Sequence, residues 1–259
     1  MTQYCILQLS DIHIGLEGED TYSIDVRAHF LDCLSDGIQR GAQLIVISGD
    51  IAFHAPDPKI YEWVYKQLQK TNIPWFVLPG NHDSSKQLAH HFSQKEWYKP
   101  EQNEMYSSII WNRRQLIFLD SAKGDLSTPQ LDWLSEQLSI QKDSTPLIFL
   151  HHPPTPIQMM HMENPYHGPS PKLLHQIETQ RPHSHIFVGH YHINRVVSRP
   201  KSTIYTCPST YFQIDPTTKN FKSESQQPGY SLIHFDEHTL MRTTHYLPAK
   251  LLPNQTSIA

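Results

Sequence analysis

The sequence predicts a layered α/β sandwich that forms one domain over residues 1–259. In the first half of the chain, short apolar segments of strand length alternate with amphipathic segments of helical spacing, which is the pattern of βαβ units. Towards the end of the chain, several segments alternate polar and apolar residues as antiparallel strands do. A length of 259 residues is sufficient for one sizeable core.

The expected elements follow from these periodicities. In the first half, strands are expected at Ile6–Leu9, Leu44–Ser48 and Pro74–Leu78, and helices at Ile24–Arg40 and Pro58–Lys70. The middle of the chain predicts a hairpin of Ser107–Trp111 with Gln115–Asp120, helices at Gln130–Ser139 and Lys172–Glu178, and strands at Leu147–Leu150 and Ile186–Val188.

The last part of the chain is predicted to be rich in β-structure. Its expected antiparallel strands are Val196–Arg199, Thr203–Thr206, Tyr230–Phe235 and Thr239–Tyr246. Two stretches are expected to be loops: Pro153–Pro171, which is rich in proline, and Asp215–Gly229, which is polar.

The composition narrows the class of protein. The net charge of −4 disfavours non-specific binding to nucleic acid, which depends on cationic contacts to phosphates. The three cysteines have no paired spacing, which fits a reducing compartment and neither a disulfide framework nor a zinc–thiolate site. There is no signal-peptide pattern and no apolar run long enough for a membrane helix. We therefore expect a cytoplasmic protein that binds neither nucleic acid nor membrane, and we leave a homodimer open.

Polar residues of metal-binding types follow five of the predicted strands. Because the carboxyl ends of strands form the ligand crevice in α/β sheets, these side chains are expected to meet there. The 18 histidines in the chain mean that spacing and context must select the relevant ones. The residues selected in this way are Asp11, His13, Asp50, Asn81, His82, His151, His190 and His192.

These residue types predict a site for two divalent ions. Carboxylates and imidazoles suit Mn, Fe and Zn, and Asp50 can bridge two ions. Two such ions with Asp11 and Asp50 ionised leave a formal charge of about +2, which attracts an anion. Paired metals lower the pKa of a bridging water and stabilise phosphoryl oxygens during in-line attack. The alternative for the two aspartates is helix capping or turn formation, which does not explain why all the motifs occur together.

The ordered motifs D-x-H, G-D, G-N-H-[DE], H and G-H-x-H resemble those of the calcineurin-like metallophosphoesterase family. The resemblance implies a four-layer α/β/β/α sandwich, in which two mixed β-sheets are flanked by helices. It also implies that Asp11, His13, Asp50 and His192 hold one metal ion, and that Asp50, Asn81, His151 and His190 hold the other. His82 would be the acid that protonates the leaving alkoxide, and Asn81, His82 and His192 would contact the substrate. The metals implied are Fe and/or Mn.

Further segments are similar to the class III bacterial cyclic-nucleotide phosphodiesterases. They are Leu150–Pro154, Gly189–His192, Cys207–Thr210 with Gln213 and Pro216, and Pro228–Tyr230. The resemblance implies hydrolysis of 3′,5′-cyclic nucleotides, cyclic AMP above all, to nucleoside 5′-monophosphates through a metal-bridging hydroxide. One loop departs from the usual W-L-D…L-R-N stretch and reads Ile157–Met162 and Pro165–Pro169. Because that loop borders the substrate, the Met159–His167 segment is predicted to set substrate choice.

Other substrates and roles remain open on the sequence alone. A phosphodiesterase for a glycerophosphodiester or a 2′,3′-cyclic nucleotide is the alternative within the fold, and a metal-dependent scaffold without turnover is the alternative outside enzymes. A DNA nuclease is disfavoured because the chain lacks a basic stripe.

Several individual residues have more than one interpretation. His151 is favoured over His152 as the ligand, and His152 is expected to orient a ligand. His54 is a candidate for the rim of the site, Met159–Met162 for packing against a base or within the loop, and Asp120 for a turn or structural carboxylate.

Overall fold

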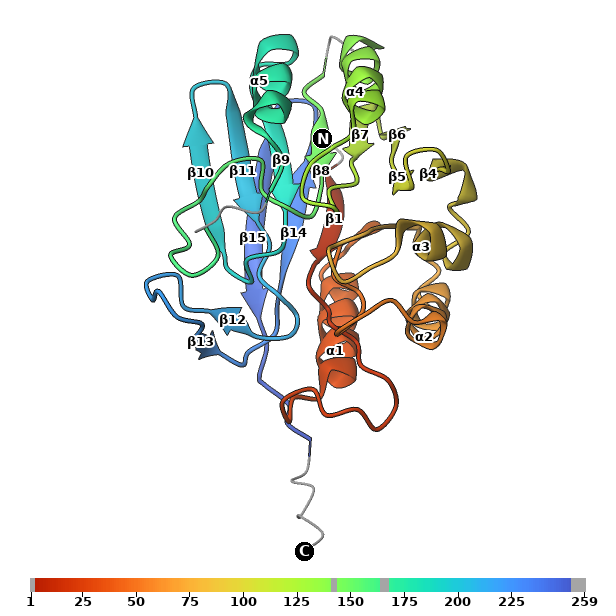
Figure 1. Cartoon of the computed structure of the whole chain (residues 1–259), viewed down its shortest axis with the longest axis vertical. Coiled ribbons are helices and arrows are strands. Elements are labelled where there is room, and N and C mark those ends of the chain that lie inside the picture. The colour runs from red at the N-terminus through yellow and green to blue at the C-terminus, as the bar shows by residue number, and fades with distance from the viewer. Residues whose placement is uncertain (1–2, 141–143, 164–167, 253–259) are drawn as a thin grey trace, which may run out of the picture.

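The computed structural model describes residues 3–140, 144–163 and 168–252 of the chain. Within this part, a five-stranded sheet of order β15-β14-β1-β2-β3 packs against a six-stranded sheet of order β10-β11-β9-β8-β7-β6 (Figure 1). The first sheet contains β1 (Tyr4–Leu9), β2 (Leu44–Ser48), β3 (Trp75–Leu78), β14 (Gly229–Phe235) and β15 (Leu240–Tyr246). The second contains β6 (Ser107–Trp111), β7 (Arg114–Phe118), β8 (Leu147–Phe149), β9 (Ser184–Val188), β10 (Arg195–Arg199) and β11 (Ser202–Thr206).

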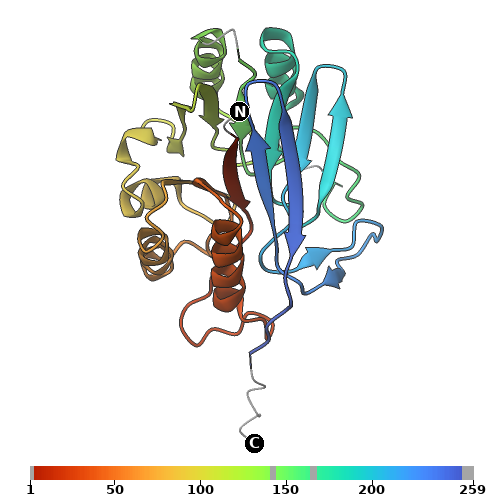
Figure 2. The same cartoon turned by 180° about the vertical axis from the view of Figure 1, so that it is seen from behind.

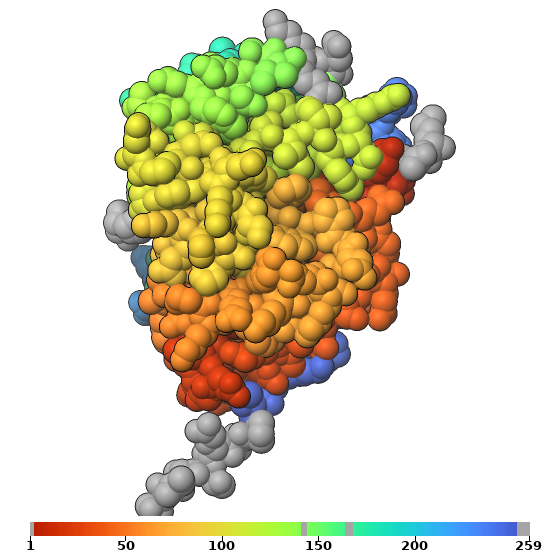
Figure 3. All heavy atoms as spheres, turned by 90° about the vertical axis from the view of Figure 1, so that its right-hand side faces the viewer, coloured from red at the N-terminus to blue at the C-terminus, as the bar shows by residue number. Residues whose placement is uncertain are grey.

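The helices are α1 (Val26–Gln39), α2 (Pro58–Gln69), α3 (Ser85–His91), α4 (Thr128–Ile140) and α5 (Pro171–Gln180), with a 3₁₀ turn at Lys95–Trp97. Two small hairpins complete the described structure, β4 (Tyr98–Lys99) with β5 (Glu104–Met105), and β12 (Gln213–Ile214) with β13 (Ser223–Ser225). The helices α2 and α3 and the β4–β5 hairpin cover the face turned to the viewer in Figure 3. No helix in the described ranges combines the length and apolarity that crossing a bilayer requires.

Both sheets are mixed, as the sequence predicted. In the first sheet β1, β2 and β3 are parallel, whereas β14 pairs antiparallel with β1 and with β15. Figure 2 shows the β14–β15 hairpin crossing the back of the molecule beside β1. In the second sheet β7, β8, β9 and β11 are parallel, and β6 and β10 close its two edges in antiparallel pairing. The parallel strands place their carboxyl ends, and the loops that follow them, at one end of each sheet.

The burial pattern along β8 shows that the second sheet is covered on both faces. Leu147 and Phe149 belong to the main core, which lies between the two sheets. Ile148 and Leu150 belong to a second cluster with residues of α4 and α5. Successive side chains of a strand point to opposite faces, so the sheet lies between the other sheet and these helices. With α1 packed on the outer side of the first sheet, the layers follow the predicted α/β/β/α order.

An aromatic ladder lies across neighbouring strands of the second sheet. Phe118 stacks on Phe149 with ring centroids 5.5 Å apart, Phe149 on Phe187 at 5.1 Å, and Phe187 on Tyr205 at 5.0 Å. The first three rings are completely buried in the main core. Aligned aromatic pairs on adjacent strands stabilise the register of the sheet, which in turn fixes where the loops at its ends lie.

Most predicted elements are confirmed, with shifts of one or two residues at their ends. The helix predicted from Ile24 begins at Val26, because the Asp25 side chain caps it by accepting a hydrogen bond from the Ala28 N–H at 2.9 Å. The prediction that 215–229 is entirely loop was wrong, since β13 lies within it and pairs with β12. The segment Thr203–Thr206 was predicted as an antiparallel strand, and β11 is antiparallel to β10 but parallel to β9. Long-range pairing of this kind leaves no trace in local periodicity.

Helix α1 approaches β1 at a glycine. A Cβ atom on Gly37 would lie 2.6 and 2.7 Å from the two methyl carbons of Leu7, a fully buried residue. The helix therefore lies closer to the sheet than any other residue at this position would allow.

We expect Gly37→Ala to lower the free energy of unfolding by about 1 kcal/mol. Overpacking costs about 1–3 kcal/mol, which exceeds the gain of about 1 kcal/mol in helix propensity. Chemical denaturation is the measurement, and Ser35→Ala on the exposed face of the same helix is the control. A Gly37→Ala variant as stable as the wild type would show that Leu7 yields easily.

Candidate metal centre

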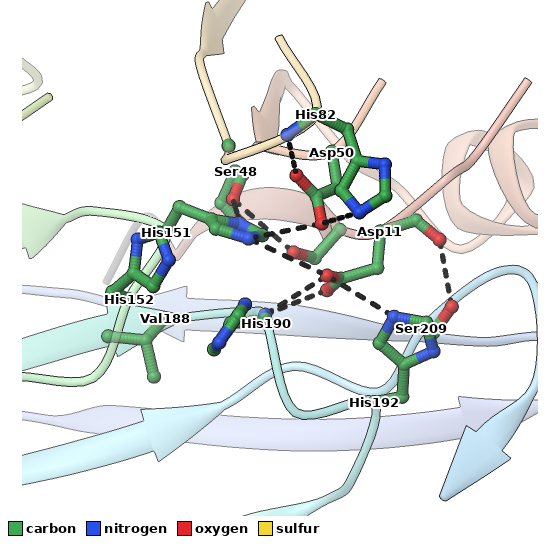
Figure 4. A network of polar contacts seen from close by, with 12 residues as sticks. Asp11, Ser48, Asp50, His82, His151, His152, Val188, His190, His192 and Ser209 are labelled. Carbon is green, nitrogen blue, oxygen red and sulfur yellow. Dashed lines mark hydrogen bonds and ion pairs between the residues drawn. The ribbon is translucent and has the colours of Figure 1, made fainter. Parts of the chain in front are cut away.

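The predicted polar residues meet where strands of both sheets end. Asp11 and His13 follow β1, Asp50 follows β2, and Asn81 with His82 follows β3. From the second sheet, His151 follows β8, and His190 with His192 follows β9. Figure 4 shows the carboxylates of Asp11 and Asp50 in the centre, with the imidazoles of His82, His151, His190 and His192 around them.

Four overlapping groups of these side chains have ligand atoms within 4.8 Å of one another, among the described residues. They are Asp11 with His13 and His192, Asp11 with Asp50 and His151, His13 with Asp50 and His82, and His151 with His152 and His190. Asp50 belongs to two groups and Asp11 to two, so the carboxylates lie between the histidines. Apart from Asn81, all the predicted ligands are thus brought together, and their roles as ligands remain predictions.

The backbone of this centre is strained. Five residues at the site have positive φ although none is glycine: Asp11 (52°), His13 (44°), Asp50 (52°), His190 (72°) and His192 (50°). Such conformations are uncommon and cost free energy, so the surrounding structure must hold them. Hydrogen bonds between loops do this: the N–H of Asp11 donates to Gly49 O and that of His13 to Asp50 O, both at 3.0 Å.

Glycine in two of the motifs has a steric reason. A Cβ on Gly80 would lie 2.1 Å from Asp50 Oδ1, and one on Gly189 would lie 2.7 Å from Asp11 Oδ2. Each carboxylate therefore packs directly on the backbone of another motif. This explains why the G-N-H and G-H-x-H patterns require glycine at their first position.

Two carboxylates are buried side by side, which is costly unless their charge is compensated. Burial alone raises the pKa of Asp50, but His151, His13 and His82 outweigh it and hold that pKa well below its ordinary value. Burial likewise raises the pKa of Asp11, but His192 and His151 outweigh burial, so the pKa of Asp11 lies below its ordinary value. Backbone N–H groups add support, since His82 N donates to Asp50 Oδ1 at 3.0 Å and His190 N to Asp11 Oδ1 at 3.0 Å.

The histidines are oriented as metal ligands are. His151 Nδ1 lies 2.9 Å from Ser48 O, and His192 Nδ1 lies 3.0 Å from Phe212 O. A carbonyl oxygen can only accept, so each Nδ1 carries the proton and each Nε2 directs a lone pair into the site when the ring is neutral. His151 Nε2 is buried without a hydrogen-bond partner among the described residues, 3.3 Å from Asp50 Oδ2 and 3.9 Å from Asp11 Oδ1.

The electrostatics of these rings fit a cation. Burial lowers the pKa of His13 to about 4. Burial and the neighbouring His151 lower the pKa of His152 to about 3. Burial, His152 and His151 lower the pKa of His190 well below its usual range. These rings are therefore neutral near pH 7. At His151, burial is outweighed by Asp50 and the pKa rises to about 9. The paired carboxylates thus attract positive charge at this nitrogen, which a proton or a divalent ion can supply. The residues present fit a dinuclear metal site.

His151 and His152 differ in what they contact. His151 lies between the two carboxylates, whereas His152 Nδ1 lies 3.2 Å from Ser121 Oγ and its ring lies 4.3 Å from that of His190. Ser121 Oγ also accepts the backbone N–H of His152 at 2.9 Å. His151 is thus the ring next to the carboxylates and His152 the ring next to His190, and the choice of His151 as ligand with His152 orienting a ligand stays a prediction.

Asn81 and His82 lie at the edge of the site. They belong to a turn that the Asp83 N–H closes on Gly80 O, and Asn81 is exposed there. The His82 side chain is 32 % exposed, with Nε2 3.9 Å from Asp50 Oδ2. His82 therefore stands between the buried carboxylates and solvent, where a substrate would enter.

Asp83 supports the site, and motif matching gave it no role. Its carboxylate accepts hydrogen bonds from the N–H groups of Ile51, Ala52 and Gly80 and from the Tyr61 hydroxyl, at 3.0–3.1 Å. It thereby joins the loop that bears Asp50 to the turn that bears His82. Burial and the charge of Asp50 raise the pKa of Asp83 to about 6. In the sequence, the acidic residue that ends the G-N-H-[DE] motif is the signal that could have identified Asp83.

The remaining candidates have structural surroundings. Asp120 accepts hydrogen bonds from Ser85 Oγ, Met105 N and Ala122 N, which confirms it as a structural carboxylate. His54 is exposed and lies against Phe53, with ring centroids 3.8 Å apart. Met159 is buried in a cluster with Tyr191 and Ile193. Of the loop predicted to set substrate choice, residues 164–167 lie outside the described residues.

A four-layer sandwich of mixed sheets, with carboxylates and imidazoles gathered at its strand ends, defines the metallophosphoesterase class. The sequence profile described as calcineurin-like phosphoesterase matches residues 5–194. The chain belongs to the calcineurin-like phosphoesterase family, and the resemblance inferred from its motifs is confirmed. Members of this family use a dinuclear metal centre, which the clusters of histidine and aspartate fit.

Similar proteins of known sequence or structure extend this result. A probable cyclic nucleotide phosphodiesterase of Fibrobacter succinogenes is 34% identical over 243 residues, which cover 92% of each chain. A glycerophosphodiester phosphodiesterase of Enterobacter lignolyticus is 29% identical, over 88% of this chain and 83% of that protein. A dimetal phosphatase from Danio rerio shares the fold, with a TM-score of 0.66 at 13% identity over 92% of this chain and 98% of that one. Family and relatives support a phosphoric diester hydrolase.

The contact between Gly80 and Asp50 can be tested without an assay of turnover. We expect Gly80→Ala to lower metal affinity by about 10- to 100-fold, as changes beside metal ligands do, because the added methyl group displaces Asp50. Metal titration followed by calorimetry is the measurement. Gly18→Ala is the control, since Gly18 has φ +81° but open space around it. Equal metal affinity in the two variants would contradict the steric argument.

Proposed function

We propose that this protein hydrolyses 3′,5′-cyclic nucleotides, cyclic AMP above all, to nucleoside 5′-monophosphates. Two divalent ions, Fe and/or Mn, would be its cofactors. The proposed ligands are Asp11, His13, Asp50, Asn81, His151, His190 and His192.

The observation that carries the reaction type is the position of His82 beside the buried carboxylates. The ring is partly exposed, while its backbone N–H is fixed on Asp50 Oδ1. A cyclic nucleotide is a diester whose leaving group is a ribose hydroxyl, and such an alkoxide is a poor leaving group without a proton. In this proposal, the His82 imidazole at the mouth of the site gives that proton.

The other residues would bind and orient the substrate. When bound, two divalent ions lower the pKa of a coordinated water and neutralise charge on the phosphoryl oxygens. Asn81 and His82, on the exposed turn after β3, and His192, on the opposite side, would contact the phosphate. His192 Nδ1 donates to Phe212 O, and His151 Nδ1 donates to Ser48 O. These hydrogen bonds keep both rings fixed during the reaction.

The substrate class is supported by the relative from Fibrobacter succinogenes, which is similar over nearly the whole chain and is named a probable cyclic nucleotide phosphodiesterase. A second candidate substrate is a glycerophosphodiester, because the relative from Enterobacter lignolyticus is named a glycerophosphodiester phosphodiesterase. A 2′,3′-cyclic nucleotide remains an alternative diester for the same site.

A substrate panel tests the proposal. Manganese-loaded protein is assayed on cyclic AMP, cyclic GMP, 2′,3′-cyclic AMP, glycerophosphocholine and bis(p-nitrophenyl) phosphate. We expect the highest kcat/KM on cyclic AMP among the biological diesters. A preference for glycerophosphocholine would establish the second candidate. No turnover of any diester, including the nitrophenyl compound, would indicate a scaffold instead of an enzyme.

The role of His82 gives a sharper prediction. We expect His82→Ala to slow cyclic AMP hydrolysis by about 10²–10⁴-fold, the usual contribution of a general acid. Hydrolysis of bis(p-nitrophenyl) phosphate should fall much less, because nitrophenolate leaves without a proton. Steady-state kinetics with metal analysis is the measurement, and His90→Ala, on the exposed side of α3, is the control. Equal losses on both substrates would rule out the leaving-group role.

A further inference from the structure

A continuous row of aromatic rings passes beside the metal centre. We call Tyr22, Phe53, Tyr211, Phe212 and Phe221 the aromatic row. Their neighbouring ring centroids lie 5.8, 5.8, 4.3 and 5.7 Å apart in that order. The middle of the row contacts two predicted ligands, since Tyr211 lies 5.5 Å from the His13 ring and Phe212 lies 4.9 Å from the His192 ring.

Only the ends of the row have freely accessible rings. Tyr211 and Phe53 are 2% and 4% exposed, and the Tyr211 hydroxyl donates to Thr21 O, so both belong to the wall of the core. Tyr22 is 68% exposed and Phe221 is 55% exposed. A flat ligand that reaches out from the metal centre can therefore stack at one end or at the other.

The Phe221 end of the row is better placed than the Tyr22 end to contact the base of a nucleotide. Phe212 is only partly buried, and its carbonyl oxygen holds His192, so this part of the row begins at the site itself. Phe221 lies one ring step further out. A ribose separates the phosphorus of a nucleotide from its base. With the phosphate at the predicted metal ligands, the base therefore lies about one ring further from them.

The charges at the two ends favour the same choice. Glu17, Glu19 and Asp20 precede Tyr22, and they would repel an anionic substrate. Lys219 and Lys222 flank Phe221, and both are exposed. Lys222 pairs with Asp215 at 3.1 Å, and the exposed Lys219 offsets the exposed Glu224, so these four residues carry no net negative charge.

The Pro-rich loop is docked on the segment that bears Phe221. Met160 N donates to Pro216 O at 3.3 Å, and His161 Nδ1 lies 3.3 Å from Lys219 O. The His161 ring lies 5.8 Å from that of Phe221, and the Met160 side chain is 49% exposed. Figure 1 shows this green loop next to the β12–β13 hairpin. Two loops that are far apart in the sequence thus form one surface beside His192.

We infer that Phe221, backed by Phe212, is the platform on which the base of the nucleotide stacks. The inference rests on the proposed function, because only a nucleotide substrate carries such a base. It assigns to the β12–β13 hairpin a part of substrate recognition that the metal-binding motifs do not contain. An aromatic platform recognises the flat face of a base and tolerates different bases, so selection between adenine and guanine depends on polar groups around it.

The experiment compares two ligands that differ only in the base. AMP and ribose 5-phosphate are bound to manganese-loaded protein, and the ratio of their Kd values measures what the base contributes. For the wild type we expect AMP to bind more tightly by roughly 5- to 100-fold, the range typical of one stacked base. Phe221→Ala should remove most of this ratio while the Kd of ribose 5-phosphate stays unchanged. Phe221→Tyr should preserve it.

Tyr22→Ala is the matched control, because it removes the exposed ring at the other end of the same row. A Kd ratio near one in the wild type, or a ratio lost in Tyr22→Ala but kept in Phe221→Ala, would overturn the inference. The kinetic panel separates this outcome from a failure of the proposed reaction. If the protein binds AMP through Phe221 but does not hydrolyse cyclic AMP, the inference about the platform stands and the proposed function is refuted.

Discussion

The pair of buried carboxylates, Asp11 and Asp50, imposes the constraint on which the rest of the structure depends. Two negative charges in the interior are tolerated only if cationic or hydrogen-bonding groups surround them. Here the supporting groups come from both sheets: backbone N–H groups of His82 and His190, and the rings of His13, His151 and His192. The loops must bring these groups within hydrogen-bond distance, and they adopt positive φ at five non-glycine residues to do so. Gly80 and Gly189 leave space for the carboxylates of neighbouring motifs.

The layered core provides the rigidity that such loops need. Strained backbone persists only where the surrounding structure over-determines it. The parallel strands β1, β2 and β3 of one sheet and β8 and β9 of the other end beside the site, and the stacked rings of Phe118, Phe149 and Phe187 fix the second sheet in its register. Asp83 adds a local connection, because its four hydrogen bonds hold the loop after β2 against the turn after β3. Core and site are therefore coupled through the ends of the strands.

The proposed reaction and the inferred recognition of the base occupy different parts of this architecture. The predicted ligands and His82 lie on short loops directly after the parallel strands β1, β2, β3, β8 and β9. The Pro-rich loop and the β12–β13 hairpin lie at the periphery, linked to each other through Met160 and His161 and to the site through Phe212. A surface of this kind can change in sequence without moving the metal ligands. This separation accounts for how relatives named for different diesters can be similar to the same chain over most of its length.

The sequence by itself determined the class of fold, the order of most strands and helices, and the residues gathered at the site. It could do so because strand and helix periodicities are local, and because each motif places its polar residues directly after a strand. It predicted Asp120 as structural and the family from five short motifs. Only the tertiary structure showed that β11 pairs with β9 and that Asp83 connects two motifs, since these contacts join residues far apart in the chain. It also showed that β13 pairs with β12, a short hairpin in a polar segment without strand periodicity. It alone placed Phe221 against Phe212, whose ring lies next to that of His192. An aromatic residue in a polar segment has no periodicity to mark it, and its neighbours are decided by how the loops pack.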